Sequence, residues 1–439
     1  MFLRPFGFLL IGLIGNLLLA GCSKKQSADY HAVRVETTSG PLELPAPFST
    51  KSAVKFSKVT GWQEGQAPTA PAGFVVTEYA RNLINPRWAY VAPNGDVFVS
   101  EANTEQKGIG KTISNVIGQA GSQRMDASAD RVTLLRDTNQ DGKPDERTVF
   151  LTGLNQPFGM LVLGEYFYVA NTDALLRFSY KMDQTKLTTK PDTILKLPAG
   201  GYNNHWTRNL LASPDGRKIY VSVGSGSNVG ENGMEHEVRR ANVLEINPDG
   251  SGERVYASGL RNPVGLAWQP GTNRLYAAVN ERDELGDGLV PDYLTSVKED
   301  GFYGWPYSYY GQNEDPRRTG EKPDLVRKAI VPDVPLGAHT ASLGLAFYNK
   351  TTFPGKYRNG AFIGQHGSWN RSELSGYKVV FVPFTNGKPG KPEDFLTGFV
   401  EKNDGQHVHG RPVGTFVLPD GSLLVTDDSG NCLWRVAAR

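Results

Sequence analysis

The sequence predicts an all-β protein, a six-bladed β-propeller with four antiparallel strands in each blade. Three observations lead to this fold class: a two-strand pattern recurs six times, further strand-like segments lie between its copies, and the last copy lacks a fourth strand that the N-terminal region can supply. The composition agrees, because 50 glycines and 28 prolines in 439 residues indicate many turns rather than long helices.

The recurring pattern is a β-hairpin. Each copy has a polar start, a short apolar strand, a turn of Pro, Gly, Asn or Asp, and then an alternating strand, as in HWTRNLLASPDGRKIYVSVG from residue 205. Segments such as VTLLRD, ALLRFSY and NVLEIN read as third strands, and RTVFLTGL, DTILKL and RVYASGL as fourth strands. The six copies start at Asn85, Asn155, His205, Arg261, His339 and His409.

The two ends of the chain are predicted to complete one blade. The last copy reaches its third strand at NCLWRV and the sequence ends at Arg439, whereas residues 73–83 read as a fourth strand with no blade before them. We expect residues 75–80 to pair with residues 433–436, because this pairing would remove two open edges and close the ring with an N-terminal strand.

One segment does not follow the repeat. Residues 281–311, after Asn280, are too long for a hairpin loop and too aromatic for a linker. We expect this segment to fold over one opening of the propeller and to form a wall of a pocket there.

The N-terminal region predicts export and a lipid anchor. Residues 1–21 contain Arg4, an apolar run and a lipoprotein box that ends at Cys22, as in a bacterial lipoprotein signal peptide. Cleavage would leave acylated Cys22 in the membrane, and Ser23 after it indicates the periplasmic face of the outer membrane in the bacterial cell envelope. An ordinary signal peptide with a chance cysteine is the alternative. Residues 22–45 are predicted as a polar tether, and residues 46–439 as the propeller.

Charge and cysteine content exclude some classes of partner and cofactor. Lys and Arg total 47 against 45 Asp and Glu, which gives no basis for a nucleic-acid partner. With Cys22 lipidated, Cys432 has no cysteine left to pair with, so no intrachain disulfide can form. The sequence also lacks a Cys-x-x-Cys-His motif for covalent haem, so any electrons would pass to a separate acceptor.

Polar residues at fixed places in the repeat predict a pocket. In a propeller, the loop that leads into the first strand of each blade (the lead-in loop) and the loop that leaves the second strand open on the same face. The lead-in loops carry Arg87, Gln156, His205, Arg208, Arg261, Asn262, His339, His409 and Arg411. The second-strand ends carry Glu101, Asn171, Asn280, Glu281, His366, Trp369, Arg371 and Asp427.

The chemistry of this set indicates an anionic, planar or sugar-like ligand. Several arginines around one axis would repel each other unless an anion lies among them. The alternative is that some point to solvent or pair with Glu101, Glu281 and Asp427. His205 adds acid–base capacity at neutral pH, because it follows the polar loop GGYNN, which offers no apolar face to pack against.

A second motif resembles a calcium-binding loop. Oxygen-bearing side chains alternate from residue 137, with Gly142 at the tight turn, but Thr148 stands where such loops carry a bidentate Glu. A structural Ca²⁺ ion and a solvated turn both stay open here. The oxygen-bearing residues are Asp137, Asn139, Asp141 and Asp145.

Three motifs, GLRNPVGLAW, NERDELGDGLVPDY and GFYGWPY, resemble the glucose/sorbosone dehydrogenase family. The resemblance covers roughly residues 70–439 and is nearer the sorbosone and pyranose dehydrogenase branch. It implies a six-bladed propeller that uses pyrroloquinoline quinone (PQQ) and Ca²⁺. It also implies oxidation of a sugar hydroxyl, or of a sugar-derived aldehyde or hemiacetal, by hydride transfer to the quinone. An external cytochrome or quinone would take the electrons.

The same resemblance implies roles for individual residues. His205 matches the general base, Arg261 and Asn262 match quinone contacts, and Arg411 matches an arginine that holds the carboxylates of the cofactor. Arg261 would also stabilise the charge that develops on the quinone oxygen. The remaining expected cofactor contacts are Arg87, Arg208, His339, His366, Trp369 and Arg371, with Arg371 or Lys378 in place of the family's carboxylate-binding lysine.

Calcium in the family is held by two consecutive backbone carbonyls of a Gly-Pro pair, besides the quinone. The matching place here reads Arg282-Asp283. Because carbonyl ligands do not depend on the side chain, the resemblance implies a Ca²⁺ ion at these two residues.

Two other functions remain open from the sequence. A calcium-dependent sugar lactonase also uses a six-bladed propeller, but it needs carboxylates and Asn at the axis, whereas the axis expected here is cationic. A non-catalytic propeller that binds envelope polysaccharide would keep the fold without the cofactor.

Overall fold

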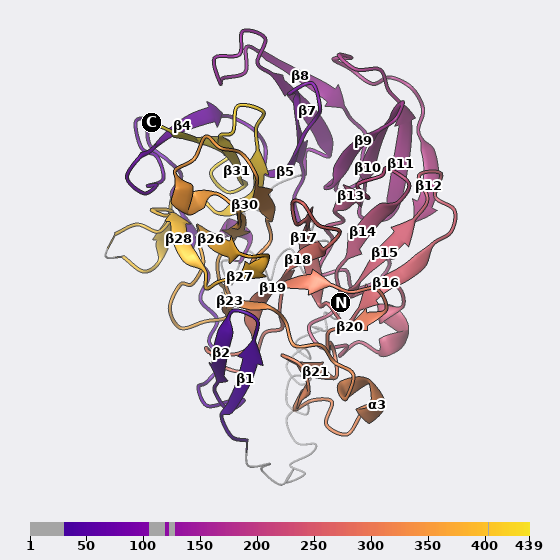
Figure 1. Cartoon of the computed structure of the whole chain (residues 1–439), viewed down its shortest axis with the longest axis vertical. Helices are drawn as coiled ribbons and strands as arrows, with labels where there is room; N and C mark the ends of the chain where they lie inside the picture. Colours follow the sequence, from indigo (N-terminus) through magenta and orange to yellow (C-terminus); the bar gives the residue numbers. More distant parts are fainter. Residues whose placement is uncertain (1–29, 105–118, 123–127, 403) are drawn as a thin grey trace, which may run out of the picture. The chain divides into compact units, whose positions relative to one another are not determined.

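Six antiparallel sheets make up the fold. The computed structural model describes residues 30–104, 119–122, 128–402 and 404–439, and Ala32–Arg439 cluster as one unit. Each sheet contains four strands paired in the order of a propeller blade, which confirms the predicted six-bladed β-propeller. Figure 1 shows the sheets side by side, with β9 towards the centre of the view and β12 at its right-hand edge.

The blades are numbered here in the order of their first strands. Blade one contains β5 (Pro86–Val91), β6 (Val97–Glu101), β7 (Arg131–Arg136) and β8 (Glu146–Leu151). Blade two contains β9 (Met160–Leu163), β10 (Tyr166–Ala170), β11 (Ala174–Ser179) and β12 (Asp192–Lys196). Blade three contains β13 (Leu210–Ala212), β14 (Ile219–Val223), β15 (Asn242–Ile246) and β16 (Arg254–Ser258). Blade four contains β17 (Asn262–Trp268), β18 (Leu275–Asn280), β19 (Pro291–Val297) and β23 (Val334–Ala338). Blade five contains β24 (Ala346–Tyr348), β25 (Gly360–Gln365), β26 (Lys378–Thr385) and β28 (Glu393–Leu396). Blade six contains β30 (Pro412–Val417), β31 (Leu423–Asp427), β32 (Cys432–Ala438) and β4 (Phe74–Ala80).

Short elements complete the described chain. None of its helices is long and apolar enough to cross a membrane. The short elements are β1 (Val33–Thr37), β2 (Gly40–Leu44), β3 (Lys58–Val59), β20 (Gly301–Phe302), β21 (Ser308–Tyr309), β22 (Asn313–Glu314), β27 (Lys388–Pro389), β29 (His407–Val408), α2 (Gln119–Ser122), α3 (Pro323–Val326) and the 3₁₀ turns Met234–Glu237 and Gly355–Tyr357.

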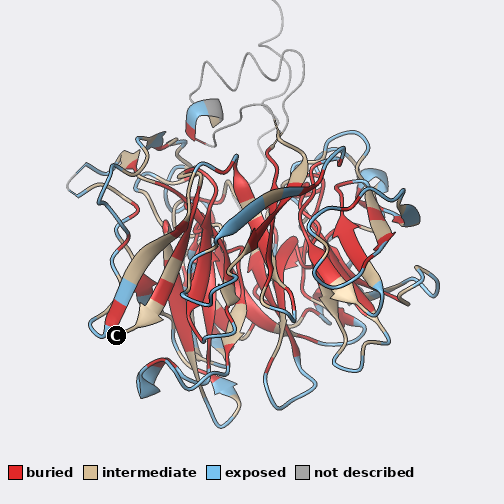
Figure 2. Cartoon of the chain, turned by 90° about the horizontal axis from the view of Figure 1, so that it is seen from above, coloured by how far each residue is buried: buried red, intermediate tan, exposed pale blue. Residues whose placement is uncertain are grey.

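The core lies between neighbouring blades. Every residue of the second strands β6, β14, β25 and β31 is buried, because each of these strands has another blade on both of its faces. Between blades one and two, the rings of Phe98, Phe150 and Phe167 pack with centroids 4.6–5.1 Å apart. Figure 2 shows this pattern, with buried residues along the sheets and exposed residues in the connecting loops.

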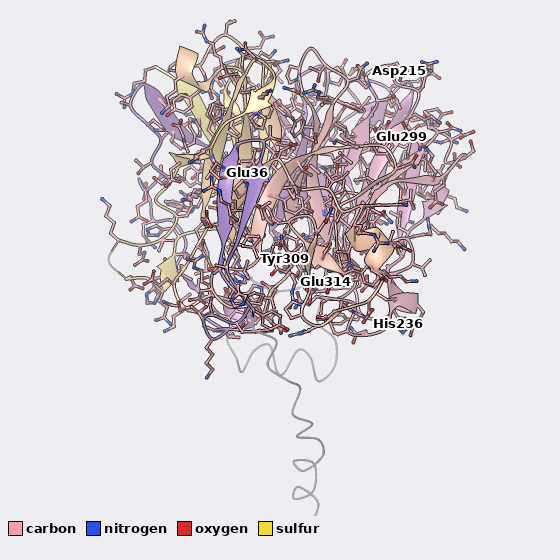
Figure 3. The ribbon with its side chains drawn as sticks, turned by 60° about the horizontal axis from the view of Figure 1, so that its bottom comes forward. Glu36, Asp215, His236, Glu299, Tyr309 and Glu314 are labelled. Carbon is pink, nitrogen blue, oxygen red and sulfur yellow. The ribbon has the colours of Figure 1, made fainter. Side chains whose placement is uncertain are left out.

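The first strands surround the central axis. Side chains from all six of them line one apolar cavity, which includes Trp88, Trp268, Phe347 and Phe416. The two ends of a blade carry different loops: Asp215 lies in the turn between β13 and β14, and His236 lies in the loop between β14 and β15, at opposite ends of the molecule in Figure 3. The lead-in loops therefore share a face with the loops that leave the second strands.

The N-terminal strand β4 pairs with the C-terminal strand β32. The two strands are antiparallel, with Ala80 opposite Leu433 and Val76 opposite Val436. This is the pairing expected from the sequence, and β4 thereby supplies the fourth strand of blade six. That the pairing holds the ring closed stays a prediction.

Deletion of residues 73–83 tests that prediction. It would expose the edge of β32 and leave the ring without a strand, so we expect the variant to aggregate where the parent stays monodisperse. Size-exclusion chromatography of freshly purified protein measures this. A monodisperse, fully folded deletion variant would contradict a role of β4 in closure.

Blade four differs from the expectation for residues 281–311. Part of this segment, Pro291–Val297, is the third strand β19, and only the shorter loop before it reaches the site face. The chain then leaves the blade, and Gly301–Phe302 pair in parallel with β16 as a fifth strand of blade three. It returns to blade four as β23. The sequence pattern missed these strands because a long insertion separates them.

Part of the predicted tether is structured. Residues 33–44 form a hairpin of β1 and β2, and the side chains of Val35 and Leu44 are buried in the same apolar cluster as Leu285 and Leu289 of blade four. The hairpin forms because its alternating apolar residues find this surface. Residues 1–29, which include the predicted signal peptide and Cys22, lie outside the described residues.

Candidate active site

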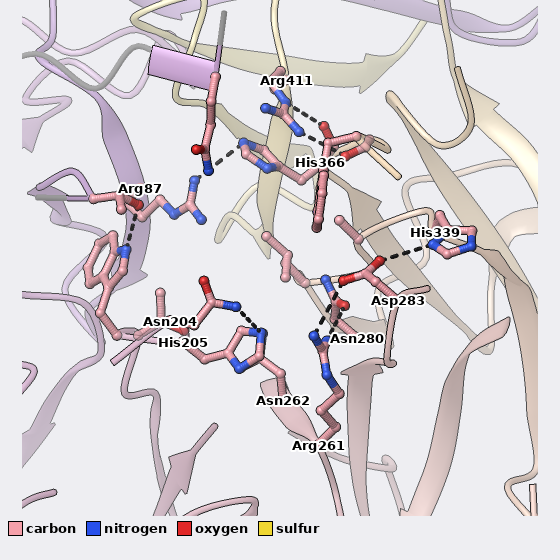
Figure 4. Close-up of a pocket in the computed structure, with 18 of the residues that line it drawn as sticks. Arg87, Asn204, His205, Arg261, Asn262, Asn280, Asp283, His339, His366 and Arg411 are labelled. Atoms are coloured by element: carbon pink, nitrogen blue, oxygen red, sulfur yellow. Dashed lines mark hydrogen bonds and ion pairs between the residues drawn. The ribbon is translucent and has the colours of Figure 1, made fainter. Parts of the chain in front are cut away.

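The lead-in loops and the second-strand ends meet in one polar pocket on the axis, as the sequence predicts (Figure 4). Eight of the ten predicted catalytic and cofactor-binding residues line it, and Arg208 and Arg371 do not. The eight are Arg87, His205, Arg261, Asn262, His339, His366, Trp369 and Arg411.

His205 presents a neutral imidazole to this pocket. Its Nδ1 lies 2.9 Å from the carbonyl oxygen of Ser225 and 3.0 Å from the hydroxyl oxygen of the same residue, so Nδ1 carries the proton. Burial, and then the positive charge of Arg261, hold the pKa of His205 well below its usual value. The ring is therefore uncharged at neutral pH, and Nε2 can accept a proton.

Arg261 is a fixed positive charge rather than a free hydrogen-bond donor. Its five N–H groups donate to Asn228, Asn280, Glu281 and Asp283, and 1% of its side chain is exposed. Arg261 would therefore interact with a quinone through its positive charge rather than through hydrogen bonds. This interaction would act across the cavity that Arg261 and His205 both line.

Arg411 differs from the other arginines of the pocket. Its guanidinium donates to three backbone carbonyls, those of His366, Gly367 and Ser122, at 2.9, 2.8 and 3.3 Å. Within the described part of the chain it forms no ion pair with a carboxylate, although the residue is only 2% exposed. The charge of Arg411 helps to lower the pKa of Asp428 nearby, and a buried guanidinium without a direct ion pair at a pocket can also attract an anion.

Arg87 and His366 share the carboxylate of Asp428. Arg87 forms an ion pair with Asp428, and His366 Nε2 lies 3.0 and 2.9 Å from its two oxygens. Burial and the charge of Arg411 lower the pKa of His366 to about 3, while the charges of Arg87 and Arg411 and the hydrogen bond from His366 outweigh burial and lower the pKa of Asp428. His366 is therefore neutral, and Asp428 is ionised. The sequence had suggested Asp427 here, but its carboxylate is buried against Trp62 and the backbone of Arg411.

His339 and Asp283 form an ion pair at the pocket wall. His339 Nδ1 lies 3.0 Å from Asp283 Oδ1, and Nε2 lies 2.9 Å from the carbonyl oxygen of Gly286. The bond to Asp283 outweighs burial and raises the pKa of His339, while the pKa of Asp283 is lowered. With both ring nitrogens donating, His339 cannot act as a base.

Arg208 and Arg371 correct the predicted set. Arg208 is fully buried, and its two terminal nitrogens donate to the carbonyls of His205, Thr207 and Pro198 and to the side chain of Asn203. It holds the loop that carries His205 instead of facing the ligand. Arg371 donates to the carbonyl of Ala338, and Lys378, its alternative, pairs with Asp394. Their places in the sequence did not reveal the direction of these side chains.

The carbonyls expected to hold calcium do not fit that role. The carbonyl oxygen of Asp283 already accepts two bonds from the guanidinium of Arg282, at 3.0 and 2.8 Å, and one from Asn228 at 3.2 Å. A carbonyl has two lone pairs, so these donors leave none for a cation. The guanidinium that caps it would also repel one. The Arg282-Asp283 calcium site stays a prediction, which the bonds at the Asp283 carbonyl disfavour.

The loop at residues 137–145 remains a prediction as a second calcium site. Its carboxylates bond within the loop: Asp145 Oδ2 accepts from the backbone N–H of Thr138 at 2.8 Å, and Asp137 Oδ2 accepts from that of Gly142 at 2.8 Å. Asn139 donates to Asp145, and Asp141 accepts from the backbone of Lys143. All of these hydrogen bonds lie within the loop, as in an ordinary turn.

Two functional residues had no signal in the sequence. Asp428 follows Asp427 at a second-strand end, where only the first of the two acids was considered. Ser225 lies just beyond β14 and binds His205 partly through its backbone carbonyl, which any residue type could supply. An alternating polar pattern cannot reveal contacts of this kind.

Comparisons with protein families and curated proteins identify similar sequences. A family model described as Glucose / Sorbosone dehydrogenase matches residues 164–368, and one described as TrAA12-like matches residues 315–438. An uncharacterized protein of Borreliella burgdorferi is 31% identical over 294 residues, which cover 64% of this chain and 76% of that protein. Aldose sugar dehydrogenase YliI of Escherichia coli is 28% identical over 196 residues, 44% of this chain and 46% of that protein.

Solved structures share the fold. The holo form of the pyranose dehydrogenase PQQ domain from Coprinopsis cinerea is 20% identical with a TM-score of 0.66, over 87% of this chain and 100% of that one. The calcium structure of a Trichoderma reesei family AA12 enzyme is 18% identical with a TM-score of 0.67, over 89% and 100%. PQQ-bound aldose sugar dehydrogenase from Streptomyces coelicolor is 17% identical with a TM-score of 0.54, over 84% and 100%.

Proposed function

Because the chain belongs to the glucose/sorbosone dehydrogenase family, we propose that it is a PQQ-dependent dehydrogenase. Its substrate would be a sugar or a sugar-derived aldehyde or hemiacetal, and its electrons would pass to an external cytochrome or quinone. One observation carries this proposal: the guanidinium of Arg411, which forms no direct ion pair among the described residues, and the neutral imidazole of His205 line the same pocket.

The residues of the pocket fit PQQ. PQQ is planar and carries three carboxylates, so its site needs cations and hydrogen-bond donors. Arg411 has no carboxylate partner among the described residues, and two buried pocket atoms, Arg87 Nε and Asn262 Oδ1, have no hydrogen-bond partner there. Arg411 and Arg87 would hold the carboxylates of PQQ, and Asn262 would accept from a protonated group of the ligand.

The chemistry divides between the cofactor and the chain. When bound, PQQ supplies an acceptor for the hydride that leaves the substrate carbon. His205 Nε2 takes the proton of the substrate hydroxyl, which its low pKa allows at neutral pH. Arg261 contributes a fixed positive charge in a water-poor site, where it favours negative charge in the transition state. Calcium at Arg282-Asp283 has no part in this proposal.

Turnover assays test the proposed function. Purified protein is mixed with PQQ, an artificial electron acceptor and a panel of sugars and sugar aldehydes. We expect acceptor reduction that requires both PQQ and a sugar. Hydrolysis of sugar lactones without PQQ would instead favour a lactonase, and binding of envelope polysaccharide without turnover would favour a non-catalytic propeller.

Removal of calcium gives a further prediction. Because the carbonyl of Asp283 is already saturated by Arg282 and Asn228, PQQ should bind with the same affinity in EGTA as in calcium. Titration of apoprotein with PQQ, followed by quenching of tryptophan fluorescence, measures both affinities. Loss of binding in EGTA, restored by added calcium, would contradict this assignment of the two carbonyls.

We also propose that a lipid on Cys22 anchors the protein to the periplasmic face of the outer membrane. The lipoprotein box before Cys22 and Ser23 after it support this location. The change Cys22→Ser should move the protein from the membrane to the soluble fraction and leave its unfolding temperature unchanged. A variant that still sediments with membranes after a salt wash would rule the anchor out.

A further inference from the structure

The loop between β14 and β15 contacts both His205 and Arg261, the two residues of the chain in the proposed chemistry. Ser225 bonds to His205, and its backbone N–H donates to the carbonyl of Arg261 at 2.8 Å. Three residues further on, the backbone and side-chain oxygens of Asn228 accept from the guanidinium of Arg261 at 3.1 and 3.0 Å. One short segment of blade three therefore sets the positions of both His205 and Arg261.

The hydrogen bonds of Ser225 fix which nitrogen of His205 is protonated. The hydroxyl of Ser225 donates its own proton to the carbonyl of Ser227 at 2.6 Å. A hydroxyl has one proton, so towards His205 the same oxygen can only accept. The carbonyl of Ser225 is also an acceptor, and Nδ1 thus faces two acceptors and carries the proton. Nε2 keeps its lone pair, and the amide nitrogen of Asn204 lies 3.5 Å from it (Figure 4).

The surroundings of Ser225 are rigid. The buried carboxylate of Glu237 accepts from the backbone N–H of Gly226 at 2.8 Å and from the hydroxyl of Ser227. Before the turn, an added Cβ at Gly224 would lie 2.4 Å from Asn262 Oδ1 and 2.6 Å from His205 Cβ, so only glycine lets the turn pass this close. Ser225 is itself fully buried.

We propose that Ser225 is the positioning residue of His205: it holds the imidazole with the proton on Nδ1 and Nε2 unprotonated, and it does so with neutral oxygens. The inference rests on the proposed role of His205 as the base. The charged groups that act on the ring are Arg261, Asp283 and Arg208, and none of them is the acceptor at Nδ1. The imidazolium formed by proton uptake therefore has no carboxylate at Nδ1 to stabilise it, which keeps His205 ready to release the proton again.

The first test reads the tautomer directly and needs no cofactor. Long-range ¹⁵N–¹H correlation spectra of the apoprotein, with the His205 signals assigned by loss in His205→Gln, distinguish protonated Nδ1 from protonated Nε2. We expect protonated Nδ1 in the parent and a partial shift to the other tautomer in Ser225→Ala, which keeps only the carbonyl acceptor. Protonated Nε2 in the parent would overturn the inference, whatever the activity of the protein.

The second test separates positioning from packing. Ser225→Ala loses one neutral hydrogen bond, so kcat should fall about 2- to 12-fold while KM and PQQ affinity stay unchanged. Ser225→Asp puts a carboxylate at Nδ1 and should move the acid limb of the pH–rate profile upward by about one to three pH units. An unchanged acid limb in a folded Ser225→Asp variant would overturn the inference. If that variant does not fold, the tautomer in Ser225→Ala decides.

The two proposals fail in different ways. A parent protein with protonated Nδ1 that does not oxidise sugars with PQQ would contradict the proposed function and leave the tautomer assignment intact. A parent that oxidises sugars but carries its proton on Nε2 would contradict the role of Ser225 alone.

Discussion

The His205→Ala variant should bind PQQ with nearly the affinity of the parent and oxidise sugars about 10²- to 10⁴-fold more slowly, the usual contribution of a general base. Binding should survive because the cations of the pocket, Arg411 and Arg87, do not contact His205. Turnover should fall because Nε2 of His205 is the neutral acceptor that can take the hydroxyl proton. Steady-state kcat at saturating PQQ, together with a PQQ titration, measures both quantities.

A matched histidine controls for this change. His236 belongs to the same blade but is exposed on the surface (Figure 3), so His236→Ala should leave kcat unchanged. Sugar oxidation by His205→Ala at the parent rate, with PQQ saturating, would show that His205 is not the base. His339 could not take over the role, because both of its nitrogens donate and its pKa is raised. His366, whose pKa is about 3, would be the next residue to replace.

The Arg411→Ala variant should bind PQQ about 10- to 150-fold more weakly, because a hydrogen bond to a charged group contributes about 1.5 to 3 kcal/mol. Arg411 forms no direct ion pair in the described chain, so its guanidinium can pair with a carboxylate of the ligand. Turnover at saturating PQQ should change far less than in His205→Ala, since Arg411 does not contact the imidazole. Equilibrium titration with PQQ gives the affinity.

Two arginines provide the controls for Arg411. Arg217 lies exposed in the β13–β14 turn on the opposite face, and Arg217→Ala should bind PQQ as the parent does. Arg411→Lys keeps a positive charge and should recover part of the affinity. Removal of Arg411 also frees three buried carbonyls, so thermal unfolding must first show that the variant is folded at the temperature of the titration. Parent-like affinity in folded Arg411→Ala would contradict the assignment of this residue.

Arg261 shows why the sequence did not suffice for every role. From the sequence, Arg261 and Arg411 are both arginines of lead-in loops with a predicted cofactor contact, and both line the pocket. The structure separates them, because all five N–H groups of Arg261 bond to the protein, whereas Arg411 makes three hydrogen bonds to backbone carbonyls and no direct ion pair among the described residues. Arg261→Ala should therefore disturb the loop at Asn228 as well as the binding of the ligand.

The fold followed from the sequence wherever the repeat was regular. Turn residues and alternating strands marked the hairpins, and the unpaired segment near residue 75 indicated its partner near residue 435. In blade four the pattern was hidden, because residues 298–333 separate β19 from β23. At the site, the repeat placed side chains on the correct face, but it did not encode their direction, as Arg208 shows, or contacts made through backbone carbonyls, as Ser225 and Asp283 show.

A single-turnover experiment tests the central claim most directly. Protein loaded with one equivalent of PQQ is mixed with excess sugar in the absence of any electron acceptor, and the absorbance of the oxidised quinone is followed with time. The proposed function predicts that at least one sugar of the panel reduces all of the bound PQQ in the parent, and about 10²-fold or more slowly in His205→Ala. Bound PQQ that stays oxidised with every sugar tested would contradict it.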